Sequence, residues 1–119
     1  MKLYVAGPMR GYEDFNFPAF FAAAKALREQ GHEVFNPAER DVNHYGKDIN
    51  KSATGDLADV PQFNLREALG ADLAWICEHA DGIALLPGWM DSDGACAEAM
   101  TGLALGLTVQ TVDEWIDAP

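Results

Sequence analysis

Hydrophobic residues occur along this chain in two kinds of pattern. In four places they form short runs, rich in valine, isoleucine and leucine, that are bounded by glycine, proline or polar residues. Runs of this length and composition predict β-strands. The predicted strands cover residues 2–6, 32–36, 82–86 and 107–112.

Between these runs, apolar residues recur every three or four positions, which is the period of an amphipathic helix. The period follows Pro18, a residue suited to a first helical turn, and lasts until Gly31, a common helix stop. It returns over residues 65–79 and 95–105, and a short helix is expected at 113–118. Strands and helices therefore alternate through most of the chain.

Residues 38–64 interrupt this alternation. They contain several Asp, Asn, Lys and Gly, few apolar residues and no sustained period. A stretch of that length without regular structure is, inside a compact domain, typically a lid, a binding loop or a partly disordered segment. The sequence therefore predicts a long loop or lid at 38–64.

The order of the elements predicts the fold class. Strands that alternate with helices form βαβ units, which build a parallel sheet covered on both faces. We expect a single domain over residues 1–119, with a doubly wound, flavodoxin- or Rossmann-like parallel sheet of about four to five strands. Ligands of such sheets bind at the carboxyl ends of the strands. The loops at Gly7–Tyr12 and Trp89–Gly94 follow predicted strands and should line the site.

Charge and composition exclude several classes of partner. The formal net charge is −11, from 19 acidic and 8 basic residues, so binding to a nucleic-acid polymer is disfavoured. No apolar run approaches the roughly 20 residues that cross a bilayer, and the N-terminus lacks the pattern of a signal peptide. We expect no membrane association and a cytoplasmic location. Cys77 and Cys96 are expected to be reduced and buried. The histidines are scattered singly, so no zinc site is expected.

Two acidic residues occupy unusual positions. Glu98 lies among small apolar residues on a predicted helix, and the loop before that helix offers unpaired N–H groups and the hydroxyl of Ser92. Asp72 lies beside the apolar stripe of the helix at 65–79. Each acid is either an ordinary solvated residue or a buried functional one, and the spacing leaves both interpretations open. Two carboxyl groups converging on one pocket would suit chemistry on a sugar.

Three further residues near the predicted strand ends are candidate site residues, and for them too the sequence does not decide between a functional and a structural role. Arg10 would pair with a phosphate or a carboxylate, or else be a surface arginine. Tyr4 is a core residue whose hydroxyl needs a partner. Trp89 would stack on a base or cover the end of the sheet. The chain lacks the glycine spacing of a dinucleotide-binding fingerprint, a Walker-type phosphate loop and the Gly-x-Ser-x-Gly motif of serine hydrolases.

Several of these segments together resemble the nucleoside 2-deoxyribosyltransferase superfamily, which includes deoxynucleoside 5′-monophosphate N-glycosidases. The resemblance spans nearly the whole chain except 38–64. A subgroup of small phage and bacterial proteins of unassigned function shares the pattern Leu-Pro-Gly-Trp-x-x-Ser-x-Gly-Ala-x-x-Glu, found here from Leu86 to Glu98. The segments that carry the resemblance are Tyr4-Val-Ala-Gly-Pro-Met-Arg-Gly11, Asp72-Leu-Ala-Trp75, Ala80-Asp-Gly-Ile-Ala-Leu-Leu86 and Ser92-x-Gly94-x-x-x-Glu98.

This resemblance implies a catalytic set. Glu98 matches the family's nucleophile, which forms an ester with the anomeric carbon of the sugar. Asp72 matches the acid that contacts the base or sugar and assists protonation of the leaving group. Tyr4 matches a tyrosine close to the nucleophile, and a hydrogen bond from it would help to keep Glu98 ionised. The chemistry implied needs no metal and no organic cofactor.

The resemblance also implies how a substrate is held. Ser92 matches a phosphate-binding serine of the glycosidases that act on monophosphates, whereas transferases that act on free nucleosides tend to have an acid there. Asp91 and Asp93 flank Ser92, so a shift of one residue would reverse that argument. Pro8 replaces a serine that glycosidases often carry, which removes a hydroxyl and an N–H. The candidate substrate-binding residues are Gly7, Pro8, Met9, Arg10, Trp89, Ser92 and Gly94.

The function expected from this resemblance is hydrolysis of the N-glycosidic bond of a nucleoside or deoxynucleoside 5′-monophosphate. One alternative is transfer of deoxyribose between bases. Another is a non-catalytic nucleotide-binding or sensor module that keeps the pocket without turnover. The expected partner is thus a small-molecule nucleoside or nucleotide. Family members usually assemble, which implies a homodimer or a higher homo-oligomer.

Overall fold

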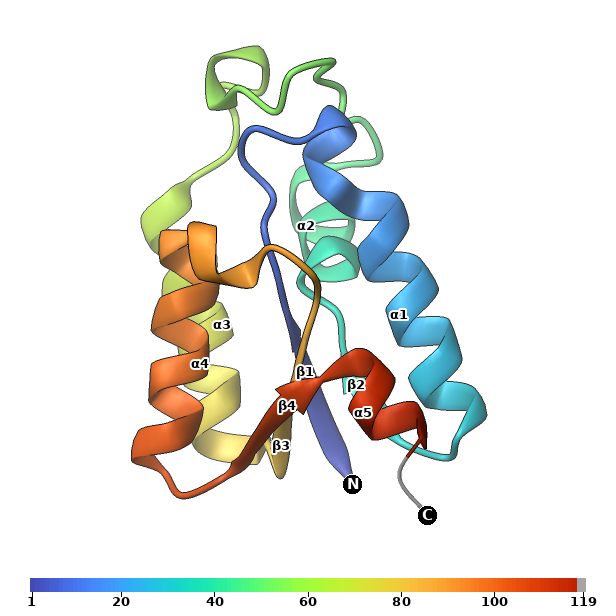
Figure 1. The fold of residues 1–119 in the computed structure, drawn as a ribbon. Coiled ribbons are helices and arrows are strands. Elements are labelled where there is room, and N and C mark those ends of the chain that lie inside the picture. The colour runs from blue at the N-terminus through green and yellow to red at the C-terminus, as the bar shows by residue number, and fades with distance from the viewer. Residues whose placement is uncertain (118–119) are drawn as a thin grey trace.

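A computed structural model describes residues 1–117, and these form one α/β unit (Figure 1). Its four strands make a single parallel sheet in the order β2-β1-β3-β4. The doubly wound fold class is therefore confirmed, with an order that matches the flavodoxin-like 2-1-3-4 arrangement. The strands are β1 (Lys2–Ala6), β2 (Glu33–Phe35), β3 (Gly82–Leu85) and β4 (Thr108–Thr111), each inside or identical to a predicted run.

Alternate residues of the central strands enter two different cores. Leu3 and Val5 of β1 face a core that includes residues of α1 (Phe17–Glu29) and α5 (Val112–Asp117). Tyr4 and Ala6 face the opposite core, which includes residues of α3 (Leu65–His79) and α4 (Asp93–Ala104). Figure 1 shows these helix pairs on opposite sides of the sheet. Because both faces are covered, the central strands are apolar throughout, as parallel strands usually are.

The predicted helices at 18–31, 65–79 and 95–105 are confirmed as α1, α3 and α4. Proline occupies the first turn of α1, and a capping side chain begins each of the other two helices. The side chain of Asn64 accepts a hydrogen bond from Glu67 N and starts α3, and Ser92 accepts one from Ala95 N and starts α4. The terminal helix α5 covers Val112–Asp117, and the predicted last residue, Ala118, lies outside the described residues.

The prediction of a loop from 38 to 64 is wrong for its first part. Residues Pro37–Tyr45 form a helix, α2, and Leu57–Asp59 form a short 3-10 turn, η2. Asn36 caps α2 through its side chain, which accepts a hydrogen bond from Ala38 N at 2.9 Å, and Pro37 occupies the first turn. The helical period was hidden because Asp41, a charged residue, occupies a buried position on the inner face of α2.

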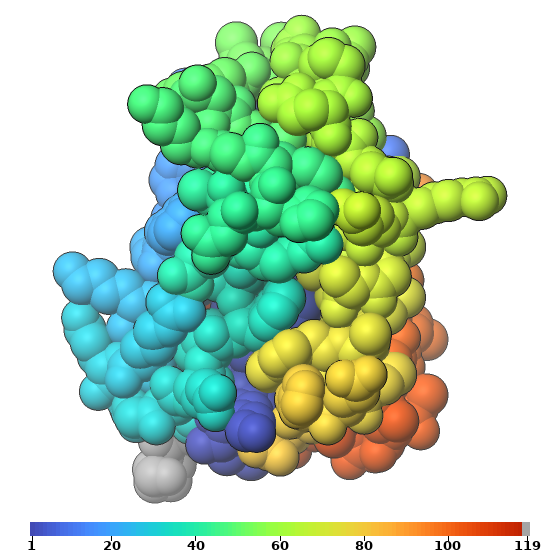
Figure 2. Space-filling model, turned by 180° about the vertical axis from the view of Figure 1, so that it is seen from behind, coloured from blue at the N-terminus to red at the C-terminus, as the bar shows by residue number. Residues whose placement is uncertain are grey.

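The rest of that segment covers the carboxyl edge of the sheet. Residues 46–64 lie at the end of the molecule where β1 and β3 finish, opposite the N-terminus (Figure 1). Ile49 and Val60 are buried there, so this part is packed onto the domain. Seen from behind, α2 and residues 46–64 lie against the start of α3 (Figure 2).

The structure also bears on the expectations about the two cysteines and about membrane-spanning segments. Cys96 is half-buried, but Cys77 is exposed, so the expectation that both thiols are buried is wrong. Cys77 belongs to the outer side of α3, where the apolar stripe gives way to solvent. Among the helices of residues 1–117, none has the length and apolar character required to cross a membrane.

Candidate functional site

A cavity lies at the carboxyl edge of the sheet, where the loops after β1 and β3 diverge. This is the switch point at which ligands bind in doubly wound folds. The cavity has a volume of about 100 Å³, which is room for several water molecules. The polar side chains that line it come from Tyr4, Arg10, Asp41, Asp72, Ser92 and Glu98.

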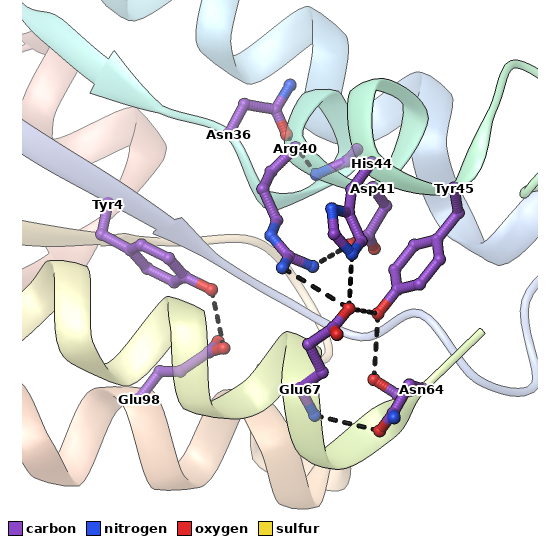
Figure 3. Close-up of polar contacts among 10 residues, drawn as sticks. Tyr4, Asn36, Arg40, Asp41, His44, Tyr45, Asn64, Glu67 and Glu98 are labelled. Atoms are coloured by element: carbon purple, nitrogen blue, oxygen red, sulfur yellow. Dashed lines mark hydrogen bonds and ion pairs between the residues drawn. The ribbon is translucent and has the colours of Figure 1, made fainter.

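Glu98 lies in this cavity, inside the domain. It is 7 % exposed, and the hydroxyl of the fully buried Tyr4 donates a hydrogen bond of 2.7 Å to its Oε2 atom (Figure 3). The two residues come from the central strand β1 and from the second turn of α4, which packs on the same face of the sheet. The interpretation of Glu98 as a solvated surface acid is therefore wrong.

Burial controls the protonation of Glu98. Removal from water raises the pKa of its carboxyl group to about 8, against the opposing effect of the Tyr4 hydrogen bond and with a further increase from the charge of Asp72. The hydrogen bond from Tyr4 is thus present as expected, but it does not by itself keep Glu98 ionised at neutral pH. Burial, together with the nearby carboxylates, also raises the pKa of Tyr4 well above its ordinary value, so Tyr4 remains a hydrogen-bond donor.

Asp72 lines the same cavity from α3. It is 7 % exposed, and its Oδ1 atom is buried without a hydrogen-bond partner among the described residues. Burial, followed by the charge of Asp41, raises the pKa of Asp72 to about 7, while the hydroxyl of Tyr4 and the charge of Arg40 act in the opposite direction. Asp72 and Glu98 therefore converge on one cavity, where the charge of Asp72 raises the pKa of Glu98.

Asp41 is a third buried acid of the cavity that sequence reasoning did not identify. It is 3 % exposed and comes from α2. Burial raises its pKa to about 6, and the neighbouring guanidinium of Arg40 lowers it. A signal for it did exist in the sequence: Asn36-Pro37 is a helix start, and on a helix that begins there Asp41 falls on the same side as Ala38 and Tyr45.

The beginning of α4 forms another part of the wall. Ser92 and Gly94 line the cavity, together with Arg10, Met9 and Gly7 from the loop after β1. The Ser92 hydroxyl oxygen accepts from Ala95 N, which leaves its own hydrogen available to a ligand. Arg10 is exposed. Five of the predicted substrate-binding residues are thus brought together.

Gly7 is required for a reason that the sequence did not indicate. A Cβ atom at this position would lie 2.7 Å from Cβ of Leu86, so the absence of a side chain allows the end of β1 to approach the end of β3. The expectation was that glycine lets backbone approach a ligand. Gly7 does line the cavity, but packing between the strands already excludes a larger residue.

Two predicted substrate-binding residues, Pro8 and Trp89, do not line the cavity. Pro8 is buried, and its carbonyl oxygen accepts a hydrogen bond of 3.0 Å from Nδ2 of Asn16. Trp89 packs on the core between the sheet and α3 and α4, which is the covering role considered for it above. The cavity lining thus gives no support to substrate contact by either residue, and that contact stays a prediction.

The opposite wall of the cavity is apolar, and sequence reasoning missed it. Its residues come from the 3-10 turn η1 (Glu13–Asn16) and the start of α1, from the segment 46–64 and from the start of α3, which are far apart in the sequence. Only the assembled fold brings them together. They include Phe15, Phe17, Phe20, Ile49, Leu57, Val60, Phe63 and Leu69.

Phe15 reaches this wall through an unusual backbone conformation. Asp14, Phe15 and Asn16 all have positive φ angles, of 52°, 54° and 63°, in the left-handed region that disfavours side chains. The amide of Asp14 donates to the carbonyl of Ser52 at 2.8 Å, which ties this turn to the segment 46–64. Backbone strain of this kind persists where the surroundings fix it, and it occurs often at functional sites.

Within the portion of the chain that the structure covers, no group of three His, Cys, Asp or Glu side chains is arranged to hold a metal ion.

The fold and the site together define a doubly wound α/β protein with a cavity of buried carboxyl groups at the switch point of its sheet. The chain belongs to the family described as domain of unknown function DUF4406, whose model matches residues 1–111. That match includes the strands and every polar residue of the cavity. Neither the curated proteins nor the solved structures contain a match to this chain.

Proposed function

We propose that this protein hydrolyses the N-glycosidic bond of a nucleoside or deoxynucleoside 5′-monophosphate. The observation that carries the proposal is the placement of Glu98 beside Tyr4 and Asp72 in one largely apolar cavity. Enzymes that cleave glycosidic bonds usually do so with a pair of carboxyl groups that flank the reaction centre. The resemblance of the Ser92-x-Gly94-x-x-x-Glu98 segment to nucleoside 2-deoxyribosyltransferases supports the same class of reaction.

In the proposed reaction, a carboxylate oxygen of Glu98 attacks the anomeric carbon of the sugar. The bond between that carbon and the nitrogen of the base breaks, and the electron pair leaves with the base. Asp72 gives its proton to the departing base. Water, deprotonated by Asp72, then attacks the anomeric carbon and releases Glu98 with the sugar phosphate as product.

The proposed reaction requires a particular pair of protonation states. Glu98 must be ionised to attack, whereas burial places its pKa at about 8, and Asp72 must be protonated, with a pKa of about 7. At neutral pH only part of the protein carries this arrangement. The positive charge that develops on the sugar in the transition state interacts favourably with the acidic wall, and Tyr4 stabilises the ionised form of Glu98 through its hydrogen bond.

The 5′-phosphate would be held by local donors, since the net charge of −11 repels an anion at long range. Those donors are the guanidinium of Arg10, the hydroxyl hydrogen of Ser92 and the free backbone N–H groups at the start of α4 near Gly94. Helix N-termini are common binding sites for phosphate.

The test is release of free base from a panel of nucleosides and their 5′-monophosphates, followed by chromatography. The wild-type protein is expected to release base from monophosphates, and Glu98→Gln to reduce the rate at least a thousandfold because the amide cannot attack. Glu29→Gln, at the exposed end of α1, is the matched control and should retain the wild-type rate. Turnover by Glu98→Gln at the wild-type rate would refute the proposal. Addition of a second free base distinguishes a transferase, which forms a new nucleoside.

A second candidate function is a nucleotide-binding module without turnover. The observation that favours it is the raised pKa of Glu98, which leaves most of this carboxyl group protonated and non-nucleophilic at neutral pH. Such a module would bind a nucleotide in a one-to-one ratio, as measured by calorimetry, and release no base over hours. Glu98→Gln would then bind as tightly as the wild type.

A further inference from the structure

Asp41 is a buried acid that the proposed reaction does not use. Its side chain lines the cavity and is 97 % removed from solvent, yet its Oδ1 atom has no hydrogen-bond partner among the described residues. The closest positive group is the guanidinium of Arg40, whose Nη1 atom lies 3.5 Å from Oδ1. A buried carboxylate oxygen without a hydrogen bond is costly, which makes it a strong acceptor for a ligand that supplies a donor.

Asp72 lies close to the Tyr4–Glu98 pair, because the hydroxyl of Tyr4 lowers the pKa of both carboxyl groups. Asp41 lines the same cavity from a different element, α2. Figure 3 shows the Tyr4–Glu98 pair on one side and Asp41, on α2, on the other. If the anomeric carbon lies at Glu98 and the leaving nitrogen at Asp72, the outer edge of the base reaches Asp41.

The environment of Asp41 suits the edge of a planar base. Pro37, Phe63, Ala68 and Leu69 line the same cavity and offer apolar surface to the faces of a ring. An ionised carboxylate has acceptors and no donor. It therefore binds an amino group and repels a carbonyl oxygen at the same position.

The alternative is a purely structural role, in which Asp41 only neutralises the charge of Arg40. The geometry provides weak support for that role, because the contact is long and Nη1 of Arg40 also lacks a hydrogen-bond partner. Arg40 has a second acidic neighbour, Glu67, at 3.9 Å (Figure 3). A purely structural Asp41 would affect all substrates equally, which gives the two roles different experimental consequences.

We propose that Asp41 is the specificity-determining residue of this site and selects bases that present an exocyclic amino group toward α2. This inference rests on the proposed function for the orientation of the substrate. It commits to amino-bearing bases such as adenine over their oxo analogues such as hypoxanthine. A site built to hydrogen-bond a particular group rejects an analogue that lacks it by large factors.

The test compares 2′-deoxyadenosine and 2′-deoxyinosine 5′-monophosphates, which differ at the amino or oxo group of the base. At pH 7.5 the wild type is expected to show kcat/KM at least tenfold higher for the amino substrate. Asp41→Asn should reduce that ratio at least tenfold, because its amide group can donate to the oxo substrate. Asp48→Asn, at an exposed position shortly after α2, should leave the ratio unchanged. A wild type without preference, or an Asp41→Asn protein with an unchanged ratio, overturns the proposal.

Binding of the same two nucleotides, measured by calorimetry with the Glu98→Gln protein, separates this inference from the proposed function. Discrimination by Asp41 in binding, with no base released by the wild type, would refute hydrolysis and retain the role of Asp41. Hydrolysis by the wild type, with equal affinity for both nucleotides, would retain the proposed function and refute the role of Asp41. If neither nucleotide binds, both proposals fail. The preference of the wild type decides the question even if Asp41→Asn does not fold.

Discussion

The carboxyl group of Glu98 illustrates how one residue is tuned by two opposing effects. Burial within the cavity favours its protonated form, and the hydroxyl of Tyr4 favours the ionised one. Asp72, the neighbouring acid, is affected in the same direction by burial. The resulting pKa values of about 8 and about 7 place both acids close to the pH at which the reaction would occur, which is where general acids and bases are most effective.

The pH dependence of kcat/KM follows from these values. Activity should increase as Glu98 loses its proton, up to pH about 8, and decrease as Asp72 loses its own proton above pH about 7. The expected profile is a narrow bell with its maximum between pH 7 and 8. Steady-state rates measured from pH 5.5 to 9.5 check this. A broad plateau that begins near pH 5 would show that Glu98 ionises as an ordinary carboxyl group does.

At the scale of the elements, the sequence predicted those whose apolar period is intact. The four strands, α1, α3 and α4 fall where runs and periods placed them. The helix α2 was missed because its buried face contains Asp41 in place of an apolar residue. Local sequence patterns fail most often where a residue serves a site rather than the core. The apolar wall of the cavity was missed because its residues come from separate segments, and no local pattern encodes which of them meet.

The start of α2 permits a test of this explanation. The side chain of Asn36 accepts from Ala38 N at 2.9 Å, and its Nδ2 donates to the carbonyl of Phe20 at 3.4 Å, so it anchors α2 to α1. Asn36→Ala should lower the free energy of unfolding by about 1–2 kcal/mol, through loss of a buried cap. Urea unfolding followed by circular dichroism measures this. Asn43→Ala, at an exposed position of α2, is the control and should change stability by less than about 0.5 kcal/mol.

At the scale of the whole molecule, three acids gathered in one cavity make stability depend on pH. Asp72 and Glu98 remain protonated in the folded state up to pH about 7 and about 8, whereas in the unfolded chain they ionise near their ordinary values of 3.8 and 4.5. Between these limits the folded state binds more protons than the unfolded one. Stability therefore decreases as pH rises, by at most about 1.4 kcal/mol per pH unit for each group.

The free energy of unfolding is accordingly expected to decrease from pH 6.5 to pH 8, a window in which Asp41, with a pKa of about 6, is already largely ionised. Urea titrations at half-unit intervals measure the slope. Glu98→Gln should flatten it, because this substitution removes the group with the highest pKa of the three. A slope that is the same in both proteins would mean that Glu98 does not hold a proton in the folded state.

The central claim is that Glu98 forms a bond with the anomeric carbon, and the stereochemistry of the product tests it most directly. Two successive displacements retain the configuration of the sugar, whereas direct attack by water inverts it. Methanol, added as an acceptor in place of water, gives a methyl glycoside whose anomeric configuration is stable. When the substrate is a β-nucleotide, nuclear magnetic resonance of this product should show the β-anomer. Formation of the α-anomer would contradict the account.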